Sequence, residues 1–311
     1  MEFFKRTPSI DFMSKRRITY AFSVALMVAS FVLLVVRGLN FGIDFTGGVT
    51  IEVNYPVAAN VDSARAALTK AGFPDARVQT FGSSRDLSVT VLPPPDEDVN
   101  VVSARVAEAL RAATPGVQVR RTEVVGPQVG EELTEQGGLA LLFTFIGILI
   151  YVGFRFEKKM AAGTVLAAMH DPVVILGFFA ATQMTFDLSV LAAVLAVIGY
   201  SINDTVVVFD RVREVFLEKR KFTPIQVLNT ALNQTLSRTL MTSFSVLFVV
   251  VSLYLFGGET LKGFSLAIIV GVFTGTYSSI FVAGALALDM GVKGQDLMTV
   301  KKEDPELKAM P

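Results

Sequence analysis

The sequence predicts a polytopic α-helical membrane protein with six transmembrane helices and one small extracytoplasmic α+β domain. Hydrophobic residues make up 52% of the 311-residue chain and charged residues 18%, whereas about 25% charged residues is usual in soluble domains. The mean hydropathy is +0.55. Apolar runs long enough to cross a bilayer recur along the chain, and a polar segment with strand and helix patterns separates the first run from the others.

The six predicted spans comprise four uncharged runs and two runs that contain acidic residues. A spanning helix needs about 20 mainly apolar residues. The third run contains His170 and Asp171 and the fourth contains Asp204, and both are assigned to the membrane because their other residues are mainly apolar. The predicted spans are 18–36, 136–154, 160–186, 188–209, 239–258 and 263–288. The last five form a bundle over residues 135–290.

Lysine and arginine residues gather at one end of the predicted spans. They are frequent in the tail of residues 1–17, in the loops after the second and fourth spans, and in the tail of residues 291–311, whereas the opposite short loops carry only Lys262. Cytoplasmic loops carry such an excess of basic residues. Both termini are therefore predicted to be cytoplasmic. The first span lacks a small-residue cleavage site and is expected to be retained.

The segment of residues 37–134 is predicted to be a domain on the outer face. Residues 49–55 alternate between apolar and polar side chains, which is typical of a strand. Apolar residues follow helical spacing after Val61 and again after Val99, and weaker strand patterns occupy 76–81, 86–92 and 117–125. The order βαββαβ indicates a split-βαβ, ferredoxin-like sandwich.

The composition excludes several classes of site. The chain has no cysteine and one histidine, which rules out disulfide scaffolds, iron-sulfur clusters, thiolate zinc sites and cysteine nucleophiles. We therefore expect no metal and no cofactor. The formal net charge is zero, and it gives no indication of a nucleic-acid partner.

Asp204 lies inside the fourth predicted span, where an ionisable group needs a partner or a function. Placing such a group in a bilayer costs at least about 2.5 to 3.5 kcal/mol. Arg238 precedes the uncharged run of the fifth span, so the two residues are predicted to pair. A helix movement that changes their separation would make Asp204 bind and release a proton, as in a proton relay. A static ion pair that fixes helix register is the alternative.

Asp171 lies near the middle of the third span, beside His170 and before Pro172. Pro172 should kink the helix and free a backbone carbonyl. Asp171 is therefore either a second relay station or a structural hydrogen-bonding group, and the structural role is favoured. His170 is interpreted as a packing residue. An intramembrane aspartyl protease would need a glycine-flanked aspartate, which Asp204 is not.

Small residues recur at every fourth position of the last span and form a smooth ridge for close helix packing. A contact inside the chain is favoured over a contact with a partner subunit. The residues are Ala267, Gly271, Gly275, Ser279, Ala283 and Ala287.

Five short segments together resemble the signature of the SecD/SecF family of protein-export membrane proteins, a family of the resistance-nodulation-division type. They are GIDFTGG at 42–48, VGPQVGEEL at 125–133, the pair at 170–171, SINDTVVVFDRVRE at 201–214 and SRTLMTS at 237–243. The resemblance covers essentially the whole chain, and the modest outer domain is similar to the SecF branch of the family. The matching residues outside the relay are Gly42, Asp44, Phe45, Gly47, Gly48, Gly126, Pro127, Gly130, His170, Asp210 and Arg211.

The resemblance implies a function, partners and site residues. Members of the family use the proton motive force to assist the late, outer-face stage of preprotein export through the SecY channel. The implied partners are SecD in a heterocomplex, the SecY/SecE/SecG translocon, YajC as an optional further subunit, the translocating preprotein and membrane lipids. Asp204 and Arg238 match the aspartate and arginine of the family's proton relay, and Asp171 is a third candidate.

The sequence therefore predicts a non-enzymatic, multi-pass protein of the bacterial cytoplasmic (inner) membrane. Two other classes of function stay open. One is half of a proton-driven exporter of lipids or small amphiphiles, which should need a substrate pocket and a larger outer domain. The other is a translocon scaffold that transduces no energy, which should tolerate loss of its buried charge.

Overall fold

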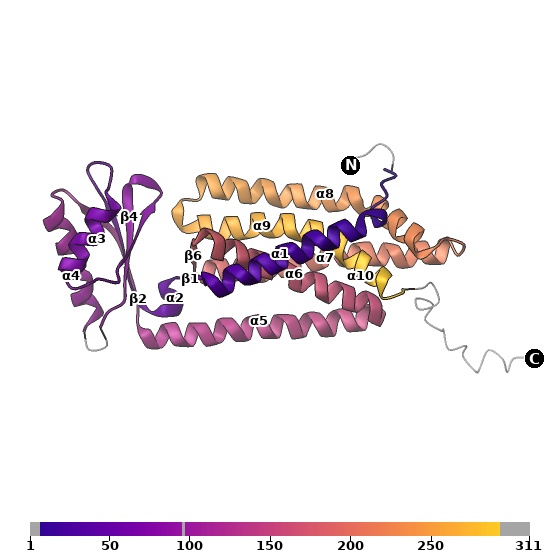
Figure 1. Cartoon of the computed structure of the whole chain (residues 1–311), viewed down its shortest axis with the longest axis horizontal. Coiled ribbons are helices and arrows are strands. Elements are labelled where there is room, and N and C mark those ends of the chain that lie inside the picture. Colours follow the sequence, from indigo (N-terminus) through magenta and orange to yellow (C-terminus); the bar gives the residue numbers. More distant parts are fainter. Residues whose placement is uncertain (1–6, 95–96, 293–311) are drawn as a thin grey trace, which may run out of the picture.

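The structure is a computed structural model that describes residues 7–94 and 97–292. Figure 1 shows two parts along the long axis, a bundle of long helices and an α/β domain beyond one end of it. We call the end of the bundle beside the α/β domain the proximal end and the opposite end the distal end.

Six helical stretches in the described residues are long and apolar enough to cross a membrane, which confirms the predicted number of spans. The last stretch is interrupted by a π-helical segment. The helices of the bundle are α1 (Arg16–Val36), α5 (Pro127–Arg155), α6 (Lys158–Thr182), α7 (Leu188–Glu218), α8 (Pro224–Phe256), α9 (Lys262–Ser278), the π-helix Ser279–Ala283 and α10 (Gly284–Asp289).

Several helices extend beyond the spans expected from the uncharged runs, because a helix can continue into a polar environment where hydropathy no longer marks it. α5 begins at Pro127 rather than at 136, and Pro127 occupies the first helical turn after the N-cap Gly126. α7 continues to Glu218 rather than ending at 209. α8 begins at Pro224 rather than at 239, after a capping box made by Thr223 and Gln226.

The third span is shorter than the predicted 160–186. α6 ends at Thr182, where Gln183 adopts a left-handed backbone conformation with φ of 56°. The residues that follow form strand β6 (Thr185–Phe186), which pairs in parallel with β1 (Asn40–Phe41). This two-stranded sheet joins the segment after α1 to the start of α7.

The ridge of small residues in the last span faces the inside of the bundle. A Cβ atom added to Gly271 would lie 2.3 Å from Val197 Cγ2, and one added to Gly275 would lie 3.0 Å from Ser201 Cβ. Both partners belong to α7, so the prediction of a contact inside the chain is confirmed. Only glycine permits α7 and α9 to approach this closely.

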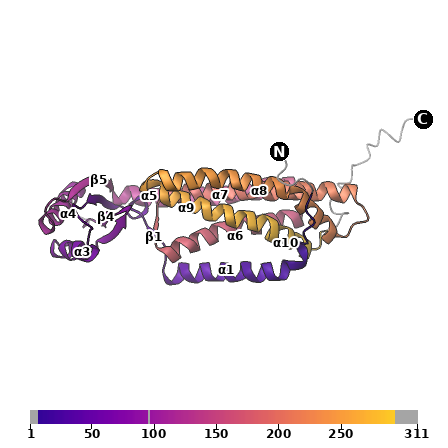
Figure 2. The same ribbon diagram turned by 90° about the horizontal axis from the view of Figure 1, so that it is seen from above.

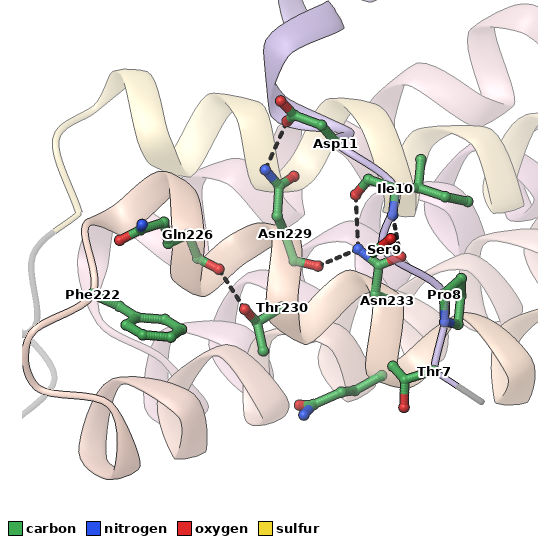
Figure 3. Close-up of a pocket in the computed structure, with 11 residues that line it drawn as sticks. Thr7, Pro8, Ser9, Ile10, Asp11, Phe222, Gln226, Asn229, Thr230 and Asn233 are labelled. Carbon is green, nitrogen blue, oxygen red and sulfur yellow. Dashed lines mark hydrogen bonds between the residues drawn. The ribbon is translucent and has the colours of Figure 1, made fainter.

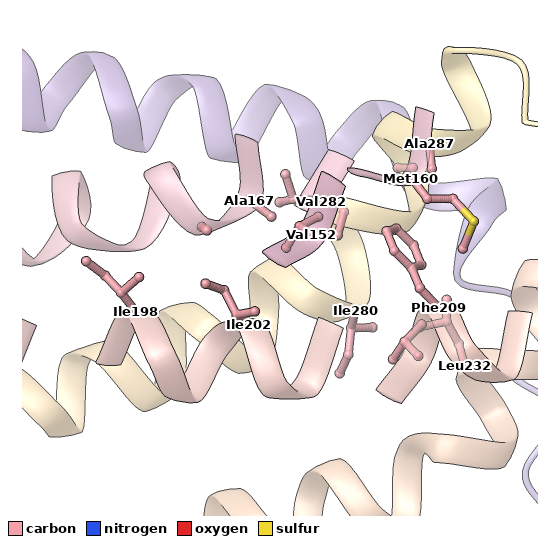
Figure 4. Packing of buried hydrophobic residues seen from close by; sticks show 14 of the residues in the cluster. Val152, Met160, Ala167, Ile198, Ile202, Phe209, Leu232, Ile280, Val282 and Ala287 are labelled. Carbon is pink, nitrogen blue, oxygen red and sulfur yellow. The ribbon is translucent and has the colours of Figure 1, made fainter. Parts of the chain in front are cut away.

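The interior of the bundle is formed by α6, α7 and α9, while α1, α5 and α8 are mostly exposed on its periphery. Figure 2 shows α1 and α8 on opposite sides of this interior. Large apolar side chains from successive helices pack together, and Figure 4 shows part of this cluster around Phe209, Leu232 and Met160. The buried carboxylates Asp171 and Asp204 therefore lie among closely packed apolar side chains.

The α/β domain has the predicted element order βαββαβ. Its sheet has the order β3-β4-β2-β5, and each neighbouring pair is antiparallel. Val49, Ile51 and Val53 of the central strand are at most 1% exposed, because α3 and α4 cover the face from which they project. The elements are β2 (Gly48–Asn54), α3 (Val61–Lys70), β3 (Arg77–Phe81), β4 (Ser83–Val91), α4 (Val99–Ala113) and β5 (Gln118–Val125).

The open face of the sheet looks toward the proximal end of the bundle. Arg77 Nη1 of β3 donates a hydrogen bond of 2.6 Å to Asn40 Oδ1 in the β1 segment. Arg121 Nη1 of β5 donates one of 3.4 Å to Thr260 Oγ1 in the loop between α8 and α9. The sheet therefore contacts the bundle through polar side chains.

Candidate functional site

Asp204 is buried in the middle of the bundle without a complete set of partners. It lies on α7 and is 2% exposed. Its Oδ2 atom is buried and accepts no hydrogen bond from the residues that the structure describes. A buried carboxylate oxygen that lacks a donor is costly while it carries charge, because desolvation is not compensated there.

Arg238 of α8 lies near enough to Asp204 for an electrostatic interaction, and the side chain of Thr242 on the same helix lies beside the same carboxylate. Among residues 7–94 and 97–292, however, no ion pair within 4.0 Å joins the two charges, so the direct pair expected from the sequence is not formed in this conformation. Arg238 is instead exposed on the outside of α8. The distance between the Asp204 carboxylate and the Arg238 guanidinium therefore depends on how α7 and α8 lie relative to each other.

Three hydroxyl groups connect α7, α8 and α9 next to Asp204. Tyr200 Oη and Ser243 Oγ are 2.9 Å apart, and Ser243 Oγ is 2.7 Å from Thr276 Oγ1. Tyr200 lies one helical turn before Asp204 on α7. This chain of hydroxyls holds α8 against the interior helices on the proximal side of the carboxylate.

Asp171 of α6 is fully buried and, unlike Asp204, is well supplied with donors. Ser201 Oγ donates to its Oδ2 at 2.5 Å, and Ser278 Oγ donates to the same oxygen at 2.9 Å. His170 Nδ1 lies 3.0 Å from Oδ1. Asp171 therefore ties α6 to α7 and α9, and its charged form is compensated by hydrogen bonds.

His170 is buried beside Asp171. Within residues 7–94 and 97–292, its Nε2 atom has no hydrogen-bond partner, and its ring centroid lies 6.3 Å from that of Tyr277. The Tyr277 hydroxyl is engaged elsewhere, since it donates to the carbonyl of Thr19 and lies 2.9 Å from Ser23 Oγ. His170 thus packs among the interior helices and orients Asp171.

The glycine-rich segment 42–48 forms a short helix, α2 (Ile43–Thr46), at the proximal end. Asp44 Oδ2 accepts a hydrogen bond of 3.0 Å from the backbone N–H of Leu188, the first residue of α7. Asp187 caps the same helix through Val190 N. Two carboxylates therefore satisfy free N–H groups at the start of the helix that carries Asp204.

The glycines of this segment fit against the start of α5. Gly47 has φ of 68°, and a Cβ atom there would lie 2.9 Å from Pro127 Cα. A Cβ atom on Gly130 would lie 2.7 Å from Gly47 N, and Gly126 is the N-cap of α5. The structure thus brings together the segments 42–48 and 125–133, which are distant in the sequence.

Phe45 and Gly48 complete this junction. Phe45 packs against Phe186 with stacked rings whose centroids are 5.9 Å apart. Gly42 N donates to the Phe186 carbonyl at 2.9 Å. Gly48, with φ of 122°, starts β2, where a Cβ atom would lie 2.7 Å from the carbonyl oxygen of Val91.

Asp210 and Arg211 lie on the distal part of α7, away from Asp204. Asp210 Oδ1 is 2.5 Å from Arg155 Nη2 at the end of α5. Arg211 Nε donates a hydrogen bond of 2.7 Å to Gln234 Oε1 of α8. Both residues connect helices at the distal end.

Sequence patterns did not identify every polar residue of the site. Ser278 and Thr276 occur in an uncharged run where hydroxyl residues are common, and nothing in their spacing sets them apart. Ser243 ends the signature segment 237–243, but that segment gave it no role. They could be found only once helix packing placed them against Asp171 and Tyr200.

Comparison with known families identifies the chain. The family described as "Protein export membrane protein SecD/SecF, C-terminal" matches residues 105–293, and the "SecD/SecF GG Motif" matches residues 32–55. The chain belongs to the SecD/SecF protein-export family. The second match contains α2 and its glycines, and the first contains Asp171, Asp204 and Arg238.

Within the SecD/SecF family the chain is similar to SecF. It is 46% identical to protein translocase subunit SecF of Vibrio alginolyticus, over 99% of this chain and 98% of that protein. It is 46% identical to SecF of Pseudomonas aeruginosa over 95% of this chain and 96% of the relative. The chain is thus a SecF-type translocase subunit and a multi-pass bacterial membrane protein.

Solved SecDF structures share the fold. A crystal structure of SecDF, a translocon-associated membrane protein from Thermus thermophilus, superposes with a TM-score of 0.82 at 35% identity over 91% of this chain. A SecDF structure in a super-membrane-facing form gives a TM-score of 0.69 at the same identity. The chain spans 39% of the SecDF chain in both cases.

Proposed function

We propose that this SecF-type subunit transfers protons through Asp204 and uses the proton motive force to assist a late step of protein export. The observation that carries the proposal is the buried Oδ2 of Asp204, which has no hydrogen-bond donor. A proton bound there removes an uncompensated charge. The proton affinity of this carboxylate therefore depends strongly on the charges and hydrogen-bond donors around it.

Arg238 supplies the second part of the proposed relay. It lies on α8, a peripheral helix, while Asp204 lies on the buried α7. When α8 brings the guanidinium closer, the charged form of Asp204 is favoured and the proton leaves; when α8 moves away, the neutral form is favoured. Proton passage and the position of α8 are thereby linked.

Asp171 has a structural role in this proposal. Its carboxylate contacts His170, Ser201 and Ser278 and so holds α6, α7 and α9 together. A rigid interior gives α8 a fixed surface against which to move. These hydrogen bonds favour a structural role for Asp171 over a role as a second relay station.

We place the α/β domain on the outer face, both termini in the cytoplasm, and the distal end of the bundle at the cytoplasmic surface. Basic residues gather at the distal ends of the helices, as expected for cytoplasmic loops. The domain has the strand order of a ferredoxin-like sandwich. Because α5 begins at Pro127, the outer domain comprises residues 37–126 rather than 37–134.

We propose SecD as the direct partner. The proposal is supported by a SecDF chain, of which this chain matches 39%, and by a relative named SecF that it covers over 98% of its length. The exposed surface of α8 combines the charge of Arg238 with apolar side chains such as Phe248, and a covering subunit would remove that charge from lipid. The proposed assembly also contains the SecY/SecE/SecG translocon, YajC and the preprotein. In this assembly the chain has a transport role and does not act as an enzyme.

The proposal is tested by Asp204→Asn in inverted membrane vesicles that contain the whole translocase. Completion of preprotein translocation is measured with and without a proton gradient. We expect the variant to lose the gradient-dependent acceleration and to keep export driven without the gradient. The matched control is Asp210→Asn, which changes an aspartate on the same helix at the distal end and should keep the acceleration.

The same measurement separates the other functions. A scaffold would keep normal acceleration in Asp204→Asn, and that result would overturn the relay. An exporter of lipids or amphiphiles would show gradient-dependent accumulation of substrate inside inverted vesicles that lack the translocon, whereas the present proposal requires the translocon.

A further inference from the structure

A pocket at the distal end of the bundle lies between the amino-terminal segment and α8. It has a volume of about 400 Å³, and Figure 3 shows its walls. One wall is the extended segment of residues 7–11, and the other is the first part of α8. Two of its lining residues also make structural contacts, since Gln226 belongs to the capping box of α8 and Gln234 accepts from Arg211.

Two asparagines of α8 fix the amino-terminal wall. Asn233 accepts a hydrogen bond from Ile10 N at 2.9 Å and donates one to Ile10 O at 2.7 Å. Asn229 Oδ1 accepts from the backbone N–H groups of Phe12 and Met13, at 3.0 Å each. Asn229 Nδ2 also donates to Asp11 Oδ1 at 2.7 Å. The wall is therefore held mainly through its backbone and additionally through the Asp11 side chain.

The floor of the pocket leads toward Asp204 along a row of polar side chains. Gln226, Thr230 and Gln234 line the pocket, and Arg238 and Thr242 continue the row beside Asp204. Successive members are four residues apart, so each is the neighbour of the next in a row that winds around α8. Its length is about 24 Å at 1.5 Å per residue.

Contacts between α7 and α8 keep this row next to the carboxylate. Arg211 donates to Gln234 two turns beyond Asp204, and Thr242 lies beside Asp204 itself. The antiparallel helices are therefore joined at both ends of the stretch that separates the pocket from the carboxylate. Val208, between these two points on α7, is buried and apolar.

We propose that the pocket is the cytoplasmic mouth of the proton path, and that Gln226, Thr230 and Gln234 carry the water through which Asp204 releases its proton. Side-chain amides and hydroxyls offer the donors and acceptors that ordered water needs. The inference rests on the proposed function of Asp204. Gln234 is assigned as a positioning residue for Arg238, because the two residues lie one turn apart on α8.

The absence of cysteine from the chain allows a direct test with single-cysteine variants in the complete translocase. Gln226→Cys, Thr230→Cys and Gln234→Cys are treated with a positively charged, membrane-impermeant thiol reagent on the cytoplasmic side of inverted vesicles. The control is Ile225→Cys, which is 40% exposed at the same end of α8 but does not line the pocket.

We expect all four cysteines to react. Modification of the three row positions should slow gradient-dependent export at least fivefold, while export without a gradient and the control variant stay within twofold of the untreated protein. Unreactive row cysteines, or modified row cysteines with normal gradient-dependent export, would overturn the proposal. Since each variant is compared before and after modification, a folding defect cannot imitate this result.

A second pair of variants separates the mouth from the relay itself. Gln234→Leu should reduce proton release from the inverted vesicles severalfold, and Gln234→Asn should restore it, whereas a purely packing role would favour the leucine. Equal proton release in the two variants would contradict the inference. If Asp204→Asn keeps gradient-dependent export, the proposed function fails together with this inference. If Asp204→Asn loses gradient-dependent export but the modified row variants keep it, only the proposal of the cytoplasmic mouth is wrong.

Discussion

The hydroxyl of Ser201 donates a hydrogen bond of 2.5 Å to Oδ2 of Asp171 and so joins the middles of α7 and α6. Asp204 lies one turn further along α7, yet its Oδ2 has no donor. Two aspartates at neighbouring levels of one bundle thus differ in hydrogen bonding, and in the proposed function this difference separates a structural carboxylate from a proton-carrying one.

This difference predicts that the same substitution costs more stability at Asp171 than at Asp204. Asp171→Asn puts an amide NH₂ where an oxygen accepts from Ser201, Ser278 or His170, so we expect a loss of about 1 to 3 kcal/mol in the free energy of unfolding. Asp204→Asn should cost less than about 1 kcal/mol. Unfolding in detergent, followed by circular dichroism, measures both. Equal losses would contradict the assignment.

Asp44 should stabilise the start of α7. Replacing it by alanine removes the acceptor for Leu188 N, and loss of such a cap costs about 0.5 to 2 kcal/mol. Asp44→Asn should cost less because its amide oxygen can still accept. Hydrogen exchange at the Leu188 amide provides the measurement, and unchanged protection in Asp44→Ala would show that this contact does not matter.

The glycines of α5 should differ in their tolerance of alanine. In Gly130→Ala the new methyl group would lie 2.7 Å from Gly47 N, so the junction must open, and we expect a loss of about 1 to 3 kcal/mol. Gly138→Ala is the control, since nothing lies within 4 Å of its Cβ position and helix propensity favours alanine. Thermal unfolding compares them; equal midpoints would refute the close approach.

A reversible disulfide can test whether the α/β domain must separate from the loop between α8 and α9 during gradient-dependent export. Glu259 Cγ lies 2.8 Å from a Cβ atom built on Gly82, so a Gly82→Cys, Glu259→Cys pair should oxidise. We expect oxidation to abolish gradient-dependent export and a reductant to restore it. The control pair, Thr50→Cys with Thr90→Cys, bridges partners within the sheet and should have no effect.

That experiment also needs the single Gly82→Cys variant, because Gly82 has φ of 79° and a side chain there is strained. The single variant should export normally under oxidising conditions. If the oxidised double variant also exports normally, the outer domain need not separate from the loop between α8 and α9.

Asp86 should make the stability of the outer domain depend on acidity. Hydrogen bonds from Ser83 and Asn54 lower the pKa of its carboxyl from the ordinary value of 3.8. Its stabilising contribution is therefore complete above pH 3.8 and is lost as the pH falls through the lowered pKa.

We accordingly expect Asp86→Ala to cost about 1 kcal/mol at pH 7 and progressively less below pH 4. Hydrogen exchange of the sheet in the full-length protein measures the cost at each pH. Asp75→Ala, at an exposed loop position, is the control and should change stability by less than about 0.5 kcal/mol. A cost for Asp86→Ala that does not vary with pH would contradict the prediction.

Much of the architecture follows from local patterns. The six spans are visible because a bilayer requires long apolar helices, and the strands and helices of the α/β domain are visible because their apolar residues repeat every two or three to four positions. The helix ends were less predictable. α8 extends to Pro224 through polar residues whose burial depends on neighbouring helices.

The sequence by itself determined which ionisable residues lie within the spans, since the cost of placing Asp171, Asp204 or His170 in a bilayer does not depend on the fold. Only the tertiary structure decided their surroundings. Asp171 gains Ser278 from α9, 107 residues away, whereas Asp204 gains no direct ion pair with Arg238 among the residues that the structure describes. Hydrogen bonds act over about 3 Å, so the roles of the two carboxylates depend on helix packing that no local pattern specifies.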